Sequence, residues 1–200
     1  MEILAVIPES TRKDKGGEGP GLEAPTIPEG LSSIERDRLR ALREEIRTGS
    51  PLTNWEPNRL LPAYLRFQGN MYRRIPREAW ENRHSSVEIL IVSGFYGLLD
   101  SSDPVVRYEH SMAEATAPFG KLNRWWHERG LATILAAYVQ KRKPRVVVDL
   151  LSREYREAVA GFEHSLTGIR VETIDFPGLG RGSQPKRGEK ITQILTTGKI

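Results

Sequence analysis

Three short, almost uninterrupted apolar runs constrain the fold more than any other feature of this sequence. They cover residues 2–7, 87–93 and 145–150. Such a run, bounded by turn residues and too short for a typical helix, is typical of a strand that is buried on both faces. Residues 169–174 alternate apolar and polar side chains and predict a further strand. Because helical stretches separate these strands, the sequence predicts an α/β domain with a mixed, largely parallel sheet flanked by helices.

Helix start and stop signals place the helices between the strands. Ser32 and Glu35 have capping-box spacing and predict a helix through Arg47. Its apolar residues recur at near-helical spacing: Ile34, Leu39, Leu42 and Ile46. Residues 121–140 are the longest helix candidate. Four shorter signals complete the pattern: Pro76 opening a short helix, Ser152 capping another that ends near Ala160, Pro144 ending the long one, and a last helix over 188–195.

The length of 200 residues predicts one domain over 1–200. Residues 8–30 carry many glycines, prolines and charges and predict a long loop. Residues 176–187 are rich in glycine, proline and basic side chains. We therefore expect a mobile basic C-terminal segment from about 177 to 200.

Several functional classes are disfavoured by what the chain lacks. It has no cysteine, which excludes disulfides, thiolate metal sites and cysteine nucleophiles and fits a reducing compartment. No stretch approaches the roughly 20 apolar residues of a membrane-spanning helix, and the N-terminus lacks a basic leader. We expect a cytoplasmic protein without membrane partners. Four scattered histidines without ligand spacing predict no metal site, and no cofactor motif is present. The oligomeric state stays open.

Polar residues follow the predicted strands, where ligands gather in open α/β sheets. Glycines there let the backbone approach an anion, although they could equally make a tight turn. Lysine could neutralise a phosphate. The candidate ligand-binding residues of these three segments are Ser10, Lys13 and Gly17; Ser93, Gly94, Tyr96 and Gly97; and Ser152, Glu154 and Tyr155.

Two acidic residues are the candidates for proton transfer. Asp149 directly follows a buried strand, where a carboxylate is costly unless it is paired, so it could serve a ligand or cap the next helix. Glu109 lies beside Tyr108 and His110. The basic stretch that includes Lys186 and Arg187 could meet a phosphate backbone or form a solvated tail.

Several segments, taken in order, resemble the YaaA family. The start Pro8-Glu9-Ser10 with Lys13 and a double glycine is similar to the family's opening. Residues 64–72 resemble its Phe-x-Gly-Asp-x-Tyr segment, and Ser93-Gly94-Phe95-Tyr96-Gly97 resembles its Ser-Gly-Leu-Tyr-Gly signature. Other elements match at Tyr108, Met112, Trp126, residues 148–155 and residues 186–188. The chain is identified as a divergent, C-terminally shortened member.

Three positions depart from the family pattern. Asp149 replaces an asparagine, Glu109 stands where arginine is common, and Asn70 replaces an aspartate. The resemblance implies a YaaA-like α/β fold with a positively charged cleft, DNA binding, and protection from hydrogen peroxide by limiting free intracellular iron. The net charge of +4 is compatible with a nucleic-acid partner but does not establish one.

Two functions are favoured at this point, and a domain that serves only in protein interactions is neither favoured nor excluded by the sequence. The first is a stress-response protein that binds nucleic acid, DNA in particular, through the charged cleft. The alternative is an enzyme that acts on a nucleobase, nucleoside or nucleotide, for example at a glycosidic bond. In that enzyme Glu109 or Asp149 would be the general acid or base, with Tyr108 beside them. Tyr96 and Tyr108 would contact the base, and Lys13 or Arg187 would hold a phosphate.

Overall fold

Five strands form the central sheet in the computed structural model, which describes residues 1–17, 27–50 and 59–200. Their order is β4-β3-β1-β8-β9, and every neighbouring pair is parallel except β3 and β4. The prediction of a mixed, largely parallel sheet is therefore confirmed. The strands are β1 (Ile3–Pro8), β3 (Val87–Ser93), β4 (Gly97–Asp100), β8 (Val146–Asp149) and β9 (Arg170–Thr173).

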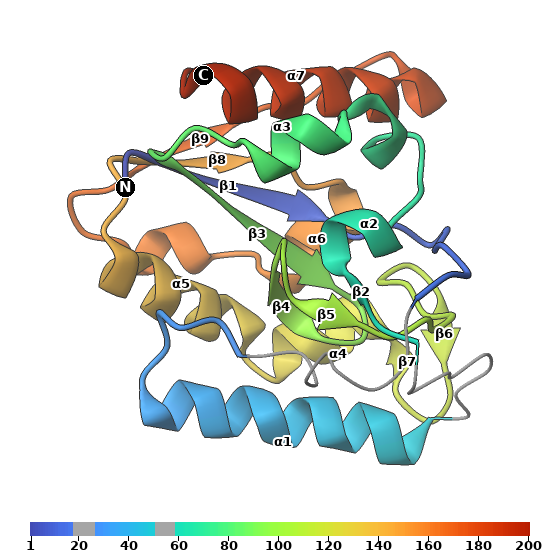
Figure 1. The fold of residues 1–200 in the computed structure, drawn as a ribbon. Helices are drawn as coiled ribbons and strands as arrows, with labels where there is room; N and C mark the ends of the chain where they lie inside the picture. Colours follow the sequence, from blue (N-terminus) through green and yellow to red (C-terminus); the bar gives the residue numbers. More distant parts are fainter. Residues whose placement is uncertain (18–26, 51–58) are drawn as a thin grey trace.

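Helices cover both faces of this sheet (Figure 1). Helices α3 (Arg77–Glu81) and α7 (Ser183–Thr197) lie on one face, and α4 (Leu122–Glu128) and α5 (Leu131–Arg142) lie on the other. Helix α1 (Ser33–Gly49) contacts α5 from outside. The short elements are β2 (Leu61–Pro62), α2 (Ala63–Arg66), η1 (Tyr72–Arg74), β5 (Pro104–Val105), β6 (Ala115–Thr116), β7 (Gly120–Lys121), α6 (Arg153–Ala158), η2 (Phe162–Ser165) and η3 (Gly180–Gly182).

The strand order creates a crevice beside the central strand. The chain leaves β1 toward β3 on one side, whereas it leaves β8 toward β9 on the other side. Neighbouring parallel strands whose following connections run in opposite directions open a crevice at their carboxyl ends, and ligands of open α/β sheets bind there. The fold therefore directs attention to the segments that follow Pro8 and Asp149.

Helix α1 was predicted correctly in extent but not in every buried position. Leu39, Leu42 and Ile46 are buried, whereas Ile34 is 76% exposed. At 3.6 residues per turn, the five-residue step from Ile34 to Leu39 turns about 140° around the helix, so Ile34 leaves the buried face. The hydroxyl of Ser32 bonds the carboxylate of Glu35 and caps no backbone N–H. Of the predicted loops, residues 18–26 and Pro51 lie outside the described residues.

The long helix predicted over 121–140 is two helices. Helix α4 ends at Glu128 and α5 begins at Leu131, because Gly130 between them has a φ of 81°. This left-handed conformation is open to glycine and ends an α-helix. Trp125 and Trp126 are both buried in α4, so the aromatic pair belongs to the core.

The expected mobile segment near the C-terminus is instead a packed helix. Helix α7 begins at Ser183, five residues before the predicted start. Ile191, Ile194 and Leu195 are fully buried, with the i, i+3, i+4 spacing of an amphipathic helix. Their burial anchors the chain end to the core, beside η1 and α3. No helix within the described ranges is both long and apolar enough to cross a membrane.

Replacing Gly188 with alanine should destabilise the fold by about 1–3 kcal/mol, the usual cost of overpacking a close contact. A Cβ at this position would clash with the carbonyl oxygen of Met71, a backbone atom that cannot move alone. Gly182→Ala is the matched control, since its Cβ would meet nothing nearer than 3.8 Å. Urea unfolding of both variants measures the difference. Equal stability of Gly188→Ala and the wild-type chain would contradict the packing of α7 on η1.

Candidate functional site

Glu9, the first residue after β1, is the centre of a buried hydrogen-bond cluster. Glu9 is buried, with only 5% of its surface exposed. One carboxylate oxygen, Oε1, accepts the Gly94 N–H at 2.7 Å and the Tyr155 hydroxyl at 3.4 Å. The other, Oε2, accepts the hydroxyls of Ser93, at 2.9 Å, and of Tyr108. We call these five residues the Glu9 cluster.

The sequence forms this cluster through the turn that follows β3. The Ser93 oxygen accepts the N–H groups of Phe95 and Tyr96, at 3.2 and 3.0 Å, and thereby closes the turn. Trp126 donates its Nε1–H to the Gly94 carbonyl at 2.8 Å. The turn is therefore fixed from both sides, and its first N–H points at the Glu9 carboxylate.

The two tyrosines of the cluster act as neutral hydrogen-bond donors. Burial, and secondly the negative charge of Glu9, raises the pKa of the Tyr108 and Tyr155 hydroxyls well above the ordinary value. A phenol with a raised pKa keeps its proton near neutral pH. These hydroxyls thus hold the carboxylate by donating to it.

Lys13 is buried beneath the same cluster. Its ammonium group donates to the carbonyl oxygens of Ser10, at 3.0 Å, and His110, at 3.3 Å, and lies 4.0 Å from the centre of the Tyr108 ring. Burial lowers the pKa of Lys13, and the charge of Glu9 opposes that effect. Lys13 therefore joins the loop after β1 to the segment around His110.

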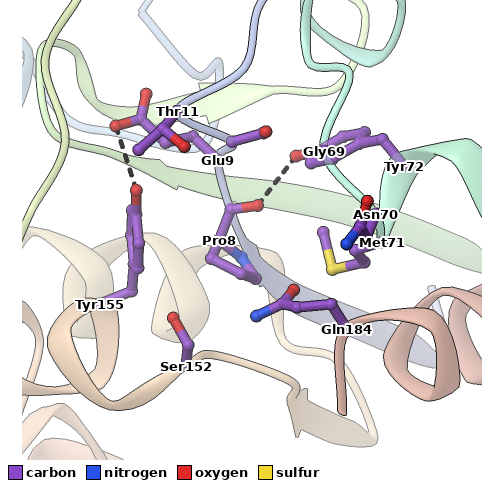
Figure 2. A pocket seen from close by; sticks show the side chains of 11 residues that line it. Pro8, Glu9, Thr11, Gly69, Asn70, Met71, Tyr72, Ser152, Tyr155 and Gln184 are labelled. Atoms are coloured by element: carbon purple, nitrogen blue, oxygen red, sulfur yellow. Dashed lines mark hydrogen bonds between the residues drawn. The ribbon is translucent and has the colours of Figure 1, made fainter. Parts of the chain in front are cut away.

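A cavity of about 250 Å³ lies at the carboxyl ends of β1 and β8, where the strand order opens the crevice. Figure 2 shows Tyr155 and Ser152 on one side and Asn70 and Gln184 on the other, with Glu9 bonded to Tyr155. The Tyr72 hydroxyl donates to the Pro8 carbonyl at 2.9 Å. The lining comprises Pro8, Glu9, Ser10, Thr11, Gly69, Asn70, Met71, Tyr72, Ser152, Tyr155 and Gln184.

Besides Lys13, the structure brings six of the predicted site residues together at this place. Three of them line the cavity: Ser10, Ser152 and Tyr155. Three others lie outside the lining and donate hydrogen bonds to the Glu9 carboxylate: Ser93, Gly94 and Tyr108.

Tyr96 and Gly97 serve the turn after β3. The Tyr96 hydroxyl accepts the Val106 N–H at 3.3 Å, and burial raises the pKa of this phenol. Gly97 has a φ of 71°, and a Cβ there would lie 2.9 Å from the Trp126 ring. These contacts match the alternative in which the glycines shape a tight turn.

The predicted acids Asp149 and Glu109 lie apart from the cavity lining. Asp149 is buried, accepts the Leu151 N–H at 2.8 Å and pairs with Arg156 at 2.6 Å. Asp149 is therefore a paired carboxylate that lies just before helix α6. Glu109 is half exposed, with its carboxylate 3.6 Å from the guanidinium of Arg107.

Four more candidates also lie outside the lining. Gly17 has a φ of 132° and packs against the backbone of Arg59. Glu154 is half-buried in the first turn of α6. Lys186 is exposed and pairs with Glu189 at 2.8 Å. Arg187 is 3% exposed, and its buried Nε and Nη1 have no hydrogen-bond partner within the described part of the chain.

Sequence reasoning missed the most connected residue, Glu9. Its signal was available, because Glu9 directly follows a buried strand as Asp149 does. Asn70 was noted only as a departure from the family pattern, and Gln184 was missed because no local pattern distinguishes it from other surface amides. Among residues 1–17, 27–50 and 59–200, no group of three or more His, Asp or Glu side chains is placed to hold a metal ion.

Comparison with known proteins points to one family. The profile of the peroxide stress protein YaaA family matches residues 28–186. A UPF0246 protein of Francisella tularensis strain SCHU S4 is 26% identical over 118 residues, which cover 57% of this chain and 45% of that protein. One from Streptococcus pyogenes serotype M4 is 27% identical over 133 residues, covering 64% of this chain and 51% of that protein.

The chain thus spans about half the length of these curated relatives. Among solved structures, a protein of unknown function, AF0587, is similar at a TM-score of 0.36 and 14% identity, covering 99% of this chain and 46% of that one. A likeness at this level supports no functional comparison.

Proposed function

This chain belongs to the peroxide stress protein YaaA family, and we propose from that premise that it binds nucleic acid in the response to peroxide stress, through the mouth of the cavity over Glu9. The family supports the stress-related role. The nucleic-acid partner, DNA in the first instance, is the proposed part. We also propose a cytoplasmic location, which a nucleic-acid partner would give the protein in bacteria such as those of the matched relatives.

The observation that carries the proposal is the placement of exposed cations around the cavity. Each segment that lines the cavity carries a basic residue within two positions of a lining residue. These residues are Arg12 after Thr11, Arg73 after Tyr72, Arg153 after Ser152, and Lys186 after Gln184.

Two of these cations have no ion-pair partner among the described residues. Arg153 pairs with Glu157 at 3.1 Å, and Lys186 pairs with Glu189. Arg12 and Arg73 make no ion pair with any residue that the structure describes. Exposed arginines without carboxylate partners are suited to phosphate oxygens, which they bind in a bidentate manner. Arg12 and Arg73 are therefore the expected phosphate contacts.

Salt dependence tests the proposal directly. We expect a fluorescein-labelled single strand to bind the full chain, with the logarithm of the binding constant falling linearly with the logarithm of salt concentration. Removing both cations in Arg12→Ala/Arg73→Ala should reduce the magnitude of that slope by about 1.4, at about 0.7 per phosphate contact on a single strand. Fluorescence anisotropy titrations over several salt concentrations measure both quantities.

Arg145→Ala is the matched control. Arg145 is 76% exposed in its side chain and precedes β8, at the opposite end of the strand from the cavity. Its removal should leave the slope unchanged. No binding of single- or double-stranded DNA at low salt would refute the proposal, and so would an equal loss in the control and in the double variant.

A second candidate function is the enzyme acting on a nucleobase, nucleoside or nucleotide. The Glu9 cluster favours it, because a buried carboxylate fixed by hydroxyl donors at the cavity edge is the kind of group that acid-base catalysis uses. Chromatography of nucleosides and single strands incubated with the protein would reveal base release or deamination. Product formation that is lost in Glu9→Gln and kept in Asp149→Asn would support this function. Absence of any product would count against it.

A further inference from the structure

The cavity lining carries only one kind of charge. Among its lining residues Glu9 is the acidic one, and none is lysine or arginine. A phosphate inside would meet this carboxylate and no cation in the lining, since Lys13 is buried beneath the cluster and the exposed arginines lie outside the lining. At about 250 Å³ the cavity is also smaller than the range of roughly 300–1,000 Å³ typical of ligand pockets. It suits one uncharged ring system rather than a whole nucleotide.

Glu9 has one hydrogen-bond position that a ligand can take. Two hydroxyl donors occupy Oε2, and a carboxylate oxygen accepts about two hydrogen bonds. On Oε1 the Gly94 bond is short, at 2.7 Å, whereas the Tyr155 bond is long, at 3.4 Å. A donor on a ligand would therefore replace Tyr155. The Tyr155 oxygen would still accept from the backbone of Met112, and its O–H would be released to bond the ligand or solvent.

Two side-chain amides face the cavity from the side opposite Tyr155. Asn70 and Gln184 line it, and no hydrogen bond joins either side chain to the described part of the chain. An amide carries both donors and acceptors, which match the mixed edge of a nucleobase. Tyr72 and Tyr155, which are largely buried, add aromatic atoms to the wall against which a flat base can pack.

We infer that the cavity takes a single unpaired nucleobase with an exocyclic amino group, which donates to Glu9 Oε1 in place of Tyr155. Adenine, cytosine and guanine carry such a group, and thymine and uracil do not. The inference rests on the proposed function, since the base enters as part of a strand whose phosphates contact Arg12 and Arg73. It adds a base preference that phosphate contacts alone do not produce.

The test compares strands that differ by one amino group. Two thymine 11-mers, one with a central adenine and one with a central purine lacking the 6-amino group, are titrated against the full chain. The adenine strand should bind about tenfold more tightly, since a hydrogen bond to a charged acceptor contributes enough for at least that factor. An all-thymine strand should bind like the purine strand.

Variants locate the preference in the cavity. Glu9→Gln should reduce the tenfold gap to less than about twofold, because the amide weakens the charge-assisted hydrogen bond. Glu163→Gln, a surface acid in η2, is the control and should keep the gap. Tyr155→Phe should keep or widen it, since the competing hydroxyl is gone. Circular dichroism of each variant checks that it is folded, and the wild-type comparison needs no variant at all.

The outcomes separate this inference from the proposed function. Equal binding of all three strands by the wild-type chain would overturn the base site and leave nucleic-acid binding intact. A gap that survives in a folded Glu9→Gln variant would also overturn it. If no strand binds even at low salt, the proposed function fails together with the inference.

Discussion

Replacing Glu9 with alanine is expected to lower the free energy of unfolding by about 3 kcal/mol, within the range for breaking a buried charge pair. The change leaves the Gly94 N–H buried without its acceptor. It also removes the negative charge that compensates the buried Lys13. The hydroxyls of Ser93 and Tyr108 can bond each other, since their oxygens are 2.9 Å apart, so they add less to the loss. Urea unfolding followed by tryptophan fluorescence measures the effect.

Glu9→Gln separates the shape of the side chain from its charge. The amide oxygen can still accept the Gly94 N–H, and the neighbouring hydroxyls can rotate to accept from the amide nitrogen. We therefore expect Glu9→Gln to be clearly more stable than Glu9→Ala. An alanine variant within about 0.5 kcal/mol of the wild-type chain, the range of an ordinary surface change, would contradict the role of Glu9 as the centre of the cluster.

Replacing Trp126 with alanine is expected to cost about 3–5 kcal/mol, the range for removing a buried aromatic side chain. Trp126 is fully buried, and its ring packs against Gly97. Its Nε1–H bonds the Gly94 carbonyl. The loss should therefore also loosen the turn that presents the Gly94 N–H to Glu9. Unfolding and strand titration on the same variant measure the two effects.

Trp126→Phe distinguishes ring volume from the indole hydrogen bond. Phenylalanine keeps much of the packing but leaves the Gly94 carbonyl without its donor, which costs about 1–3 kcal/mol when a buried acceptor is unsatisfied. An alanine variant as stable as the phenylalanine variant would contradict the packing of this ring in the core.

The strands β1, β3, β8 and β9 could be predicted because their signal is local. An apolar run such as Val87–Ser93 is typical of a strand in the middle of a sheet, and its shortness and β-branched residues favour a strand over a helix. Strand β4 was missed because Gly97–Asp100 reads as the end of a turn. It becomes a strand only by antiparallel pairing with β3, which is a contact between segments.

Helix boundaries were predicted correctly where proline or a glycine-containing turn signal marks them in the sequence. They were missed where the boundary depends on the backbone conformation that a glycine adopts in the folded chain. Pro76 and Gly49 end or begin helices as expected. Gly130 divides the long helical stretch because it adopts a left-handed φ, a choice that the surrounding helical spacing does not reveal. Helix α7 was predicted too short, since its first turn carries polar residues that pack only once η1 is in place.

The position of the candidate site could be predicted from the sequence, but the acidic residue at its centre could not. Glu9 and Asp149 present the same local pattern, a carboxylate directly after a buried strand. In the folded chain Arg156 pairs with Asp149, whereas Glu9 meets hydroxyl donors from β3, α6 and the segment around Tyr108. The partner that reaches each carboxylate therefore decides its role. Arg156 is only seven positions from Asp149, whereas the hydroxyl partners of Glu9 are 84 to 146 positions away.

The sequence by itself determined the class of fold, the sheet strands with buried runs, and membership of the YaaA family, because periodicity and ordered motifs are properties of neighbouring residues. Only the tertiary structure decided that Glu9 is the centre of the site, that Lys13 is buried, and that Asn70 and Gln184 face the cavity. The physical reason is the strand order, which places β1 between β3 and β8 and so brings together side chains more than 140 positions apart, as in the Glu9–Tyr155 pair with a separation of 146.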